Sequence, residues 1–287
     1  MEKQAVKIIE CPRDAMQGIK TFIPTSKKVE YIQQLLQVGF DTIDFGSFVS
    51  PKAIPQLKDT AEVLTQLNLS ETKSKLLAIV ANKRGAEDAA AFEQIDYLGY
   101  PFSISETFQQ RNTNASIEES MHRVEQIQNL CLKANKQLII YISMAFGNPY
   151  GDSYHEDIVA EWLAKLANLD VKTFALSDTI GVAKKEIIAK LFNLLIPAYP
   201  QLEIGAHFHT TPESWKEKIE TAFEYGCRRF DGAIKGFGGC PMASDELTGN
   251  MPTEHMVAYF SEHYKTAVVD NEQFDKAILL ASKVFPM

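Results

Sequence analysis

Short apolar segments recur along the chain, and amphipathic segments separate most of them. Eight of the apolar segments have the length and the aliphatic and aromatic content of buried strands, and polar or turn residues bound them. They span residues 6–12, 41–48, 75–81, 95–104, 137–146, 172–178, 202–209 and 228–236. The pattern therefore predicts eight strands.

The intervening segments predict helices, because their apolar positions recur every three or four residues. The clearest cover residues 27–39, 116–135, 155–169 and 212–226. Ser116 and Glu119 have the spacing of a capping box at a helix start. Gly39, Asn135 and Gly226 stand where a helix can end on a left-handed residue. Strands that alternate with helices indicate a parallel sheet.

Eight strands in near-regular succession favour a closed (β/α)₈ TIM barrel of the α/β class over an open doubly wound sheet. An open sheet usually has fewer strands and often carries a glycine-rich phosphate loop after the first, whereas this chain has PRDAMQGIK there. A barrel of about 250 residues fits the 287-residue chain as one domain. We expect a single catalytic domain over residues 1–287, with additional C-terminal helices covering the barrel from about residue 250 onward.

Composition narrows the possible partners and the location. The net charge of −8 argues against a nucleic-acid surface, and no apolar stretch approaches the roughly 20 residues needed to span a membrane. The first residues lack a signal or transit pattern, which predicts a cytoplasmic protein. Cys11, Cys131, Cys227 and Cys240 are widely spaced without a CxxC pair, so we expect reduced thiols.

Polar residues stand at or just after the ends of most predicted strands, where TIM barrels carry their active sites. They are Arg13, Asp14, Asp44, Ser47, Ser103, Ser105, Ser143, Asp178, Thr179, His207, His209, Asp231 and Lys235. We expect these side chains to form a polar ring around the mouth of the barrel.

Within this ring, His207 and His209 are two residues apart on a strand and would point to the same face. Two imidazoles and a carboxylate suit Mn²⁺, Co²⁺, Zn²⁺ or Fe²⁺, and an added amide oxygen with waters also suits Mg²⁺. The alternative is that both histidines cap the strand by bonding to backbone.

Arg13 and Asp14 fit either a surface ion pair in a turn or a metal carboxylate beside a guanidinium, and their place after an apolar strand favours the second.

The segment 235–250 carries four glycines around Cys240 and predicts a flexible loop. Such loops often close over substrates. A buried, inert thiol in a glycine-rich turn is the alternative for Cys240.

Taken together and in order, several motifs resemble the 3-hydroxy-3-methylglutaryl-CoA lyases of the DRE-TIM metallolyase superfamily. The resemblance runs through IIECPRDAMQ, FGSFVSPKAIPQ, SETFQQRNTNASIEES, SDTIGVA, AHFH, GFGGCPMA and TGN, which together cover nearly the whole chain.

The resemblance implies a role for each matching residue. Asp14, His207, His209 and Asn250 would bind a divalent metal, Mg²⁺ or Mn²⁺. The expected catalytic residues are Arg13, which would neutralise an enolate oxygen, Cys240, which would take part in proton transfer, and Asp14, Asp178 and His207. The residues expected to bind substrate are Gln17, Asp44, Ser47, Asn112, Ser143 and Thr179.

The implied reaction is the metal-dependent retro-Claisen cleavage of 3-hydroxy-3-methylglutaryl-CoA to acetyl-CoA and acetoacetate, as in leucine degradation and ketone-body metabolism. The protein would then be a carbon–carbon lyase with an acyl-CoA substrate, and a homodimer is expected. Three alternatives stay open. They are a Claisen-condensing acyltransferase resembling isopropylmalate, citramalate or homocitrate synthases, a lyase for a related 3-hydroxyacyl-CoA, and a non-catalytic acyl-CoA or metal-binding relative.

Three departures from the family pattern bear on these roles. Asp44 stands where the family carries a glutamate, and Thr210 and Glu213 stand where it usually carries an aspartate and a glycine. The segment between Cys240 and Asn250 is one residue longer than usual. The hydrogen bonds that support the metal ligands are therefore expected to differ, and such bonds commonly change metal affinity by about 10–100-fold.

Overall fold

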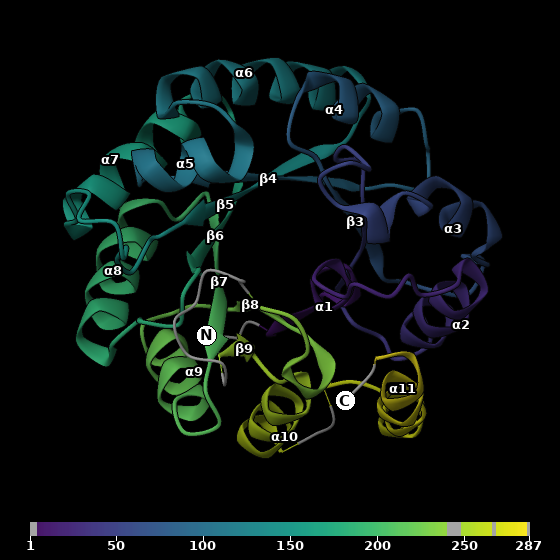
Figure 1. Ribbon diagram of the computed structural model, residues 1–287. Coiled ribbons are helices and arrows are strands. Elements are labelled where there is room, and N and C mark those ends of the chain that lie inside the picture. Colours follow the sequence, from purple (N-terminus) through teal and green to yellow (C-terminus); the bar gives the residue numbers. More distant parts are fainter. Residues whose placement is uncertain (1–4, 240–247, 266–267, 286–287) are drawn as a thin grey trace.

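The chain folds into a closed barrel of parallel strands surrounded by helices (Figure 1). The structure, a computed structural model, describes residues 5–239, 248–265 and 268–285. The barrel strands are β1 Lys7–Glu10, β2 Thr42–Ser47, β3 Lys75–Ile79, β4 Tyr97–Ser103, β5 Gln137–Ser143, β6 Thr173–Asp178, β7 Glu203–Thr210 and β8 Arg229–Gly232. Each pairs in parallel with the next, and β8 pairs with β1, which closes the sheet. The predicted TIM barrel is confirmed.

One or more helices follow each strand and form the outer ring. The longer helices are α2 Thr25–Leu35, α6 Ile117–Lys133, α7 Glu156–Ala167, α8 Lys185–Ala198, α9 Trp215–Glu224, α10 Thr253–Tyr264 and α11 Asn271–Val284. Shorter helices are α1 Pro12–Gln17, α3 Thr60–Gln66, α4 Lys83–Ala90, α5 Glu106–Thr113, η1 Pro55–Leu57 and η2 Ile234–Gly236. In Figure 1, α10 and α11 complete the ring beside α2, so the predicted C-terminal helices are confirmed.

The predicted helix ends are also present. Ser116 Oγ accepts the Glu119 N–H, and the Glu119 carboxylate accepts the Ser116 N–H, which completes the capping box. Gly39, Asn135 and Gly226 have φ values of 88°, 54° and 96°, in the left-handed region that ends a helix. Across the described ranges, none of the helices combines the length and apolar character needed to cross a membrane.

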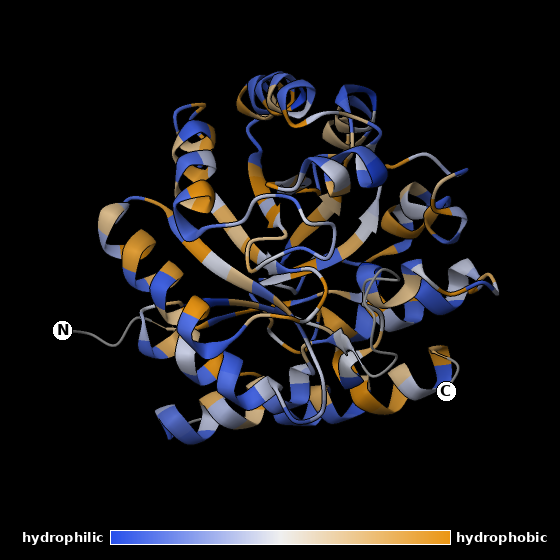
Figure 2. Ribbon diagram, turned by 60° about the vertical axis from the view of Figure 1, so that its left-hand side comes forward, coloured by the Kyte–Doolittle hydropathy of each residue, from blue (hydrophilic) through white to orange (hydrophobic). Residues whose placement is uncertain are grey.

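Apolar side chains fill two separate regions. The main core lies between the sheet and the helices, whose apolar faces turn inward while their polar faces turn outward (Figure 2). A second, smaller cluster contains Leu77, Ile79, Ile139, Tyr141 and Ala175, which alternate with main-core residues along β3, β5 and β6. Because strand side chains alternate between two faces, this second cluster fills the barrel interior. It forms an apolar wall beneath the mouth of the barrel.

A short strand brings the C-terminal part of the chain back to the barrel mouth. Strand β9, Gly249–Asn250, pairs antiparallel with the end of β7, with Asn250 opposite His209. Two of the predicted metal ligands, 41 positions apart in sequence, are therefore neighbours.

A buried glutamate joins β1 to the segment that follows β8. Glu10 is fully buried, and its carboxylate accepts the Ile234 N–H at 2.9 Å and the Thr253 hydroxyl at 2.6 Å. Burial raises the pKa of Glu10 to about 8, although the two hydrogen bonds act in the opposite direction.

This carboxyl group is expected to make stability fall with rising pH. The folded protein holds its proton up to about pH 8, whereas the unfolded chain releases it near pH 4.5, so the stabilisation is full below about pH 4.5 and lost above about pH 8. A Glu10→Gln variant can keep both contacts, because its amide oxygen accepts the Ile234 N–H and its NH₂ group donates to Thr253 Oγ1. It should lack this pH dependence, a difference on the order of a few kcal/mol. Urea unfolding of both proteins at pH 5, 7 and 8.5 measures it. If the free energy of unfolding changed equally with pH in the two proteins, Glu10 would not be the group responsible.

Candidate active site

Helix α1 begins directly after β1 and places two charged side chains at the barrel mouth. Pro12 occupies the first helical turn, where its missing N–H costs nothing. Arg13 and Asp14 follow it and are buried. Arg13 Nη1 donates to Asp14 Oδ1 at 2.8 Å and to Gln17 Oε1 at 3.0 Å, and Gln17 Nε2 donates to Asp14 Oδ1 at 2.5 Å. The three side chains form one hydrogen-bonded group.

Asp44 of β2 fixes the other side of the Arg13 guanidinium. Arg13 Nε lies 3.0 Å from Asp44 Oδ2, and Nη2 lies 2.5 Å from the same oxygen. The shorter side chain at this position therefore does reach Arg13. Burial raises the pKa of Asp44 to about 6, and Arg13 opposes the rise. Among the described residues, one N–H of Arg13 Nη2 has no hydrogen-bond partner, and Arg13 lines the central cavity.

Asp14 and the two histidines of β7 meet at the mouth. Asp14 Oδ2 lies 4.0 Å from His207 Nε2 and 3.9 Å from His209 Nε2. Burial opposes ionisation of Asp14, but Arg13 and both histidines outweigh it and hold the pKa of Asp14 well below its usual range. An ionised carboxylate oxygen thus faces two ring nitrogens.

The hydrogen bonds of the imidazoles show which ring nitrogen is available. His209 Nδ1 lies 2.8 Å from the Thr179 carbonyl oxygen, which can only accept, so Nδ1 carries the hydrogen and Nε2 keeps its lone pair. His209 Nε2 is buried and has no hydrogen-bond partner in the part of the chain that the structure describes. A buried lone pair that faces a carboxylate and a second imidazole fits a divalent cation, and these three side chains form a group that could hold a metal ion.

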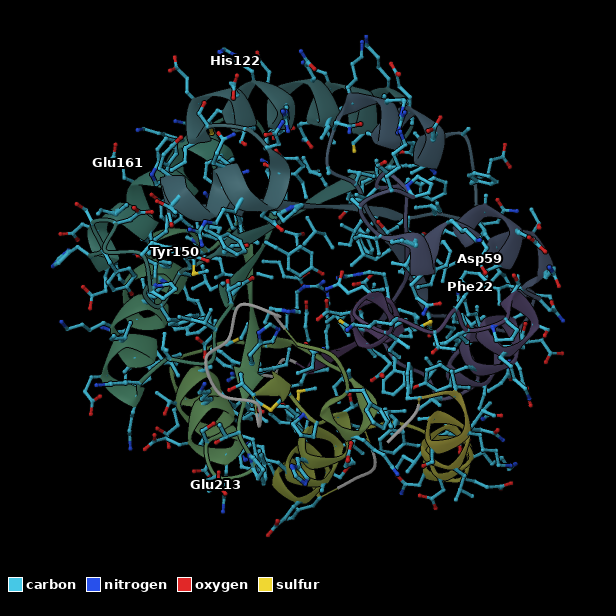
Figure 3. The ribbon with its side chains drawn as sticks, viewed as in Figure 1. Phe22, Asp59, His122, Tyr150, Glu161 and Glu213 are labelled. Carbon is cyan, nitrogen blue, oxygen red and sulfur yellow. The ribbon has the colours of Figure 1, made fainter. Side chains whose placement is uncertain are left out.

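Asn250 adjoins this group through the pairing of β9 with β7. Its amide Nδ2 donates to the Phe237 carbonyl at 2.8 Å, so Oδ1 is the atom that can serve as a metal ligand. Thr210 Oγ1 lies 3.4 Å from the Asn250 carbonyl oxygen. Thr210 therefore supports the backbone of β9, while Glu213, the other departure beyond the histidines, is exposed on the outer rim near α9 (Figure 3).

The loop that leads to Cys240 starts against α1. Gly238 has φ of 84°, and a Cβ there would lie 2.5 Å from the Asp14 carbonyl oxygen and 2.8 Å from the Ala15 Cα. Only glycine permits this approach. Gly239 lines the cavity, and the predicted catalytic Cys240 lies outside the described residues.

A cavity of about 370 Å³ opens at the mouth. Eight predicted site residues line it, namely Arg13, Asp14, Gln17, Asn112, Ser143, Thr179, His207 and His209. Apolar residues also line the cavity, among them Val49, Ile54, Pro101, Phe108 and Tyr141. The cavity thus joins an apolar wall to a charged corner made by Arg13, Asp14 and the histidines.

Four other predicted site residues are absent from the cavity lining as described. Asp44 bonds to the guanidinium of Arg13, and Asn250 lies beside His209 on β9. Ser47 Oγ donates to the Ile79 carbonyl at 3.2 Å and accepts the Val49 N–H at 3.2 Å, so it shapes the segment after β2. The fourth is Asp178, whose contacts are structural.

Asp178 is held by the loop after β6 and by a buried lysine. Its Oδ1 accepts the N–H groups of Val182 and Ala183, and its Oδ2 accepts Lys218 Nζ at 2.6 Å. Lys218 also donates to the His209 carbonyl oxygen at 2.8 Å. Lys218 therefore ties the loop after β6 to the strand end that carries His209. Sequence reasoning missed it because a lysine on an amphipathic helix is normally solvated.

Three residues that were expected in the polar ring, Ser103, Ser105 and Lys235, are absent from the described cavity lining. Ser103 Oγ lies 3.4 Å from the Ser143 carbonyl oxygen, and Ser105 Oγ caps α5 by accepting the Phe108 N–H. Lys235 is exposed and donates to Ser282 Oγ. Its left-handed backbone, with φ of 60°, turns the chain at η2, so a position just after a strand end does not place this side chain at the mouth.

A closed (β/α)₈ barrel with a carboxylate, two imidazoles and a buried arginine at the mouth of a partly apolar cavity has the features of a TIM-barrel metalloenzyme. The family model described as HMGL-like matches residues 5–278. The chain belongs to this family. Relatives similar to it are hydroxymethylglutaryl-CoA lyases, which are carbon–carbon lyases.

Two relatives illustrate the match. A hydroxymethylglutaryl-CoA lyase of Bacillus subtilis is 34% identical over 246 residues, covering 86% of this chain and 81% of that protein. A cytoplasmic 3-hydroxy-3-methylglutaryl-CoA lyase of Rattus norvegicus is 33% identical over 253 residues, covering 88% of this chain and 73% of that protein.

Solved structures agree with this assignment. The Bacillus subtilis HMG-CoA lyase superposes with a TM-score of 0.90 at 33% identity, over 98% of this chain and 94% of that one. An HMG-CoA lyase from Acinetobacter baumannii, in complex with coenzyme A and 3-methylmalate, gives a TM-score of 0.90 at 28% identity, over 99% and 93% of the two chains. The predicted family resemblance is confirmed.

Proposed function

We propose that this protein cleaves 3-hydroxy-3-methylglutaryl-CoA to acetyl-CoA and acetoacetate in a metal-dependent reaction. The observation that carries the proposal is the convergence of Asp14, His207 and His209 beside Arg13 on one cavity. The relatives named as lyases and the coenzyme A bound by the Acinetobacter baumannii enzyme support the reaction and an acyl-CoA substrate.

In this proposal Asp14, His207, His209 and Asn250 hold a divalent cation, Mg²⁺ or Mn²⁺. When bound, the cation supplies Lewis-acid activation of the substrate hydroxyl group and orients the substrate. The carboxylate and amide oxygens suit the harder Mg²⁺, and the imidazoles suit Mn²⁺.

Arg13 acts at the thioester end of the substrate. As a base accepts the hydroxyl proton, the hydroxyl carbon becomes the ketone of acetoacetate and the carbon–carbon bond breaks. The electron pair of that bond moves toward the thioester carbonyl, and negative charge grows on the carbonyl oxygen. The free N–H of Arg13 Nη2 can donate to this oxygen, while Asp14 and Asp44 hold the guanidinium in place. One well-placed donor of this kind commonly contributes about 3–4 kcal/mol.

The remaining predicted residues divide into two groups. Gln17, Asn112, Ser143 and Thr179 line the cavity and are proposed to contact the substrate. Asp44, Ser47 and Asp178 are proposed to act through their neighbours. Asp178 does so by holding Lys218, which in turn bonds to the carbonyl of the His209 peptide.

Cys240 is proposed to protonate the enolate carbon of the departing acetyl-CoA. A Cys240→Ser variant should lose turnover by about 100-fold, because a serine hydroxyl is a much weaker acid than a thiol, while Mn²⁺ affinity stays unchanged. Acetoacetate release and Mn²⁺ calorimetry measure the two quantities. Cys131→Ser is the matched control, since Cys131 is a buried thiol on α6. If Cys240→Ser kept full turnover, the Cys240 thiol would not take part in the reaction.

The direct test incubates the purified protein with 3-hydroxy-3-methylglutaryl-CoA and either Mg²⁺ or Mn²⁺, and follows acetoacetate. Release is expected with the metal, and it should fall to background with a chelator and return when metal is restored. A parallel incubation with acetyl-CoA and a 2-oxo acid tests the condensing reaction. Failure to release acetoacetate with either metal would refute the lyase proposal.

We also propose that the enzyme is a cytoplasmic homodimer. The family resemblance supports the dimer, and the rat relative above is named as cytoplasmic. Light scattering coupled to gel filtration tests the dimer, and a monomer mass at micromolar concentration would contradict it.

A further inference from the structure

Beneath the proposed metal ligands, the barrel interior contains a buried pair of opposite charges on β8. Arg229 and Asp231 are each 2% exposed, and they lie two residues apart, on the same face of the strand. In the parallel register, Asp231 lies opposite His207 of β7. The charged pair thus stands inside the barrel, with Asp231 beside a predicted metal ligand and Arg229 two residues deeper along β8.

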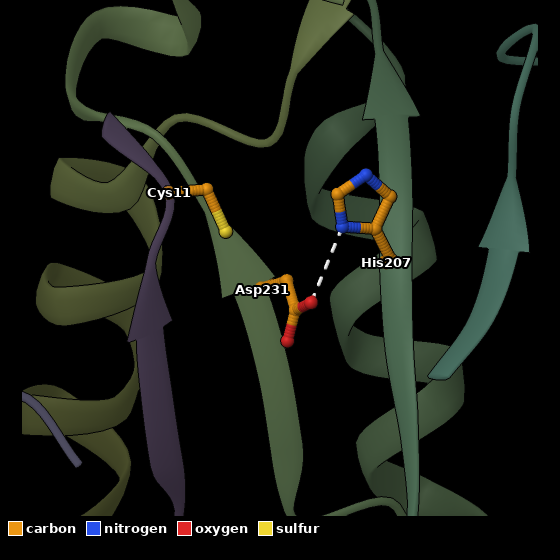
Figure 4. A group of neighbouring side chains, drawn as sticks. All are labelled: Cys11, His207 and Asp231. Carbon is orange, nitrogen blue, oxygen red and sulfur yellow. Dashed lines mark hydrogen bonds and ion pairs between the residues drawn. The ribbon is translucent and has the colours of Figure 1, made fainter. Parts of the chain in front are cut away.

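Asp231 contacts His207 on the side of the ring that faces away from Asp14. Its Oδ2 lies 3.2 Å from His207 Nδ1, and Figure 4 marks this contact with a dashed line. A carboxylate only accepts hydrogen bonds, so this contact places the ring hydrogen on Nδ1. The lone pair is then on Nε2, the nitrogen that lies 4.0 Å from Asp14 Oδ2.

Arg229 faces the second oxygen of the same carboxylate. Its Nη2 lies 3.9 Å from Asp231 Oδ1, and neither atom has a hydrogen-bond partner in the described ranges. A Cβ at Gly205 on β7 would lie 2.8 Å and 2.9 Å from Arg229 Cγ and Cδ, so glycine provides the space for the arginine stem. The two oxygens of Asp231 are therefore directed apart, one toward Arg229 and the other toward His207.

Cys11 lies beside this contact, and its sulfur, His207 and Asp231 are close enough together to hold a metal ion (Figure 4). The thiol of Cys11 donates to the Ile9 carbonyl oxygen at 3.8 Å, and a metal would require a thiolate in this fully buried position. His207 Nδ1 is already bonded to Asp231. The arrangement therefore fits a support for His207 better than a second metal site.

We propose that Asp231 is a positioning residue that fixes the tautomer and direction of His207, and that Arg229 orients Asp231 from below. The inference rests on the proposed metal site and deepens it, because it names the residues that prepare one ligand before metal binds. A hydrogen-bonded partner of this kind commonly changes metal affinity by about 10–100-fold.

The first test replaces Asp231 by asparagine, which has nearly the same shape. Its amide can donate to His207 Nδ1 and so place the ring hydrogen on Nε2. Mn²⁺ affinity, measured by calorimetry, is expected to fall by about 10–100-fold. Imidazole ¹⁵N NMR of the metal-free protein should show His207 protonated on Nδ1 in the wild type and on Nε2 in Asp231→Asn.

A double-mutant cycle tests the part of Arg229. Arg229→Met keeps an apolar stem over Gly205, and it should weaken Mn²⁺ binding several-fold in the wild-type background but not in the Asp231→Asn background. If Arg229→Met lowered Mn²⁺ affinity equally in both backgrounds, Arg229 would not act through Asp231.

Two controls separate this role from a general loss of structure. Cys11→Ala removes the neighbouring thiol and should leave Mn²⁺ affinity unchanged. Asp59→Asn breaks another buried ion pair, with Lys28 outside the barrel, and should lower stability without changing Mn²⁺ affinity. Circular dichroism and thermal unfolding establish that each variant is folded.

The outcomes distinguish this inference from the proposed function. If wild-type protein fails to bind Mn²⁺, the metal site itself is wrong. If the wild type binds Mn²⁺ and Asp231→Asn binds it equally well, with an unchanged His207 tautomer, the positioning role is overturned while the lyase proposal stands.

Discussion

In a His209→Ala variant, Mn²⁺ binding is expected to weaken by at least about 100-fold and kcat to fall by about 1,000-fold or more. His209 Nε2 is buried, lies 3.9 Å from Asp14 Oδ2 and has no hydrogen-bond partner in the described chain. Its removal takes away a proposed ligand and leaves the carboxylate facing a single imidazole. Calorimetry with Mn²⁺ and acetoacetate release at saturating metal measure the two effects.

His263→Ala provides the control, because His263 lies exposed on α10, away from the mouth. It should change neither quantity. His207→Ala is expected to behave like His209→Ala, since both rings face Asp14. If His209→Ala kept wild-type Mn²⁺ affinity, the histidine pair would be a strand cap instead of a metal site.

The sequence predicted the fold well because its periodicities are local. Alternation of strands and helices, the Ser116 and Glu119 capping box and the left-handed Gly39 and Gly226 each depend on residues close together in the chain. The shared direction of His207 and His209 followed from strand geometry alone. Such local features do not depend on how the strands are arranged in the barrel.

Contacts between distant segments were not predictable in the same way. The bond between Arg13 and Asp44 joins α1 to β2 across 31 positions of sequence, so it depends on how the two segments lie in the folded barrel. The buried Lys218 looks like any surface lysine on an amphipathic helix until the position of Asp178 is known. Lys235 adopts a left-handed backbone and is exposed, which its position just after a predicted strand end does not reveal.

The same distinction applies to the residues that support the site. Asp231 was recognisable as a polar residue at a strand end, but its contact with His207 depends on the register between β7 and β8. The pattern of polar strand ends thus identifies where an active site lies. The barrel register decides which of those side chains face the substrate and which hold their neighbours.

Replacing Arg13 by methionine is expected to lower kcat by about 1,000-fold, with a smaller change in KM, because the guanidinium donates most strongly to the charge that develops in the transition state. The same change leaves Asp44 buried without its cation, which commonly costs about 3–5 kcal/mol of stability. Acetoacetate kinetics and urea unfolding measure the two losses separately.

A second substitution separates the catalytic from the structural part of Arg13. In the double variant Arg13→Met with Asp44→Leu, the Asp44 charge is gone and the part of the stability loss due to Asp44 should return, while the part due to Asp14, which also loses Arg13, remains. The kcat value should stay low, because the proposed donor to the thioester oxygen is still missing. Asp44→Leu alone leaves Arg13 paired with Asp14 and Gln17, so its kcat should lie between those of the wild type and Arg13→Met. Recovery of kcat together with stability in the double variant would mean that Arg13 only holds the fold, and the enolate would then need a different donor.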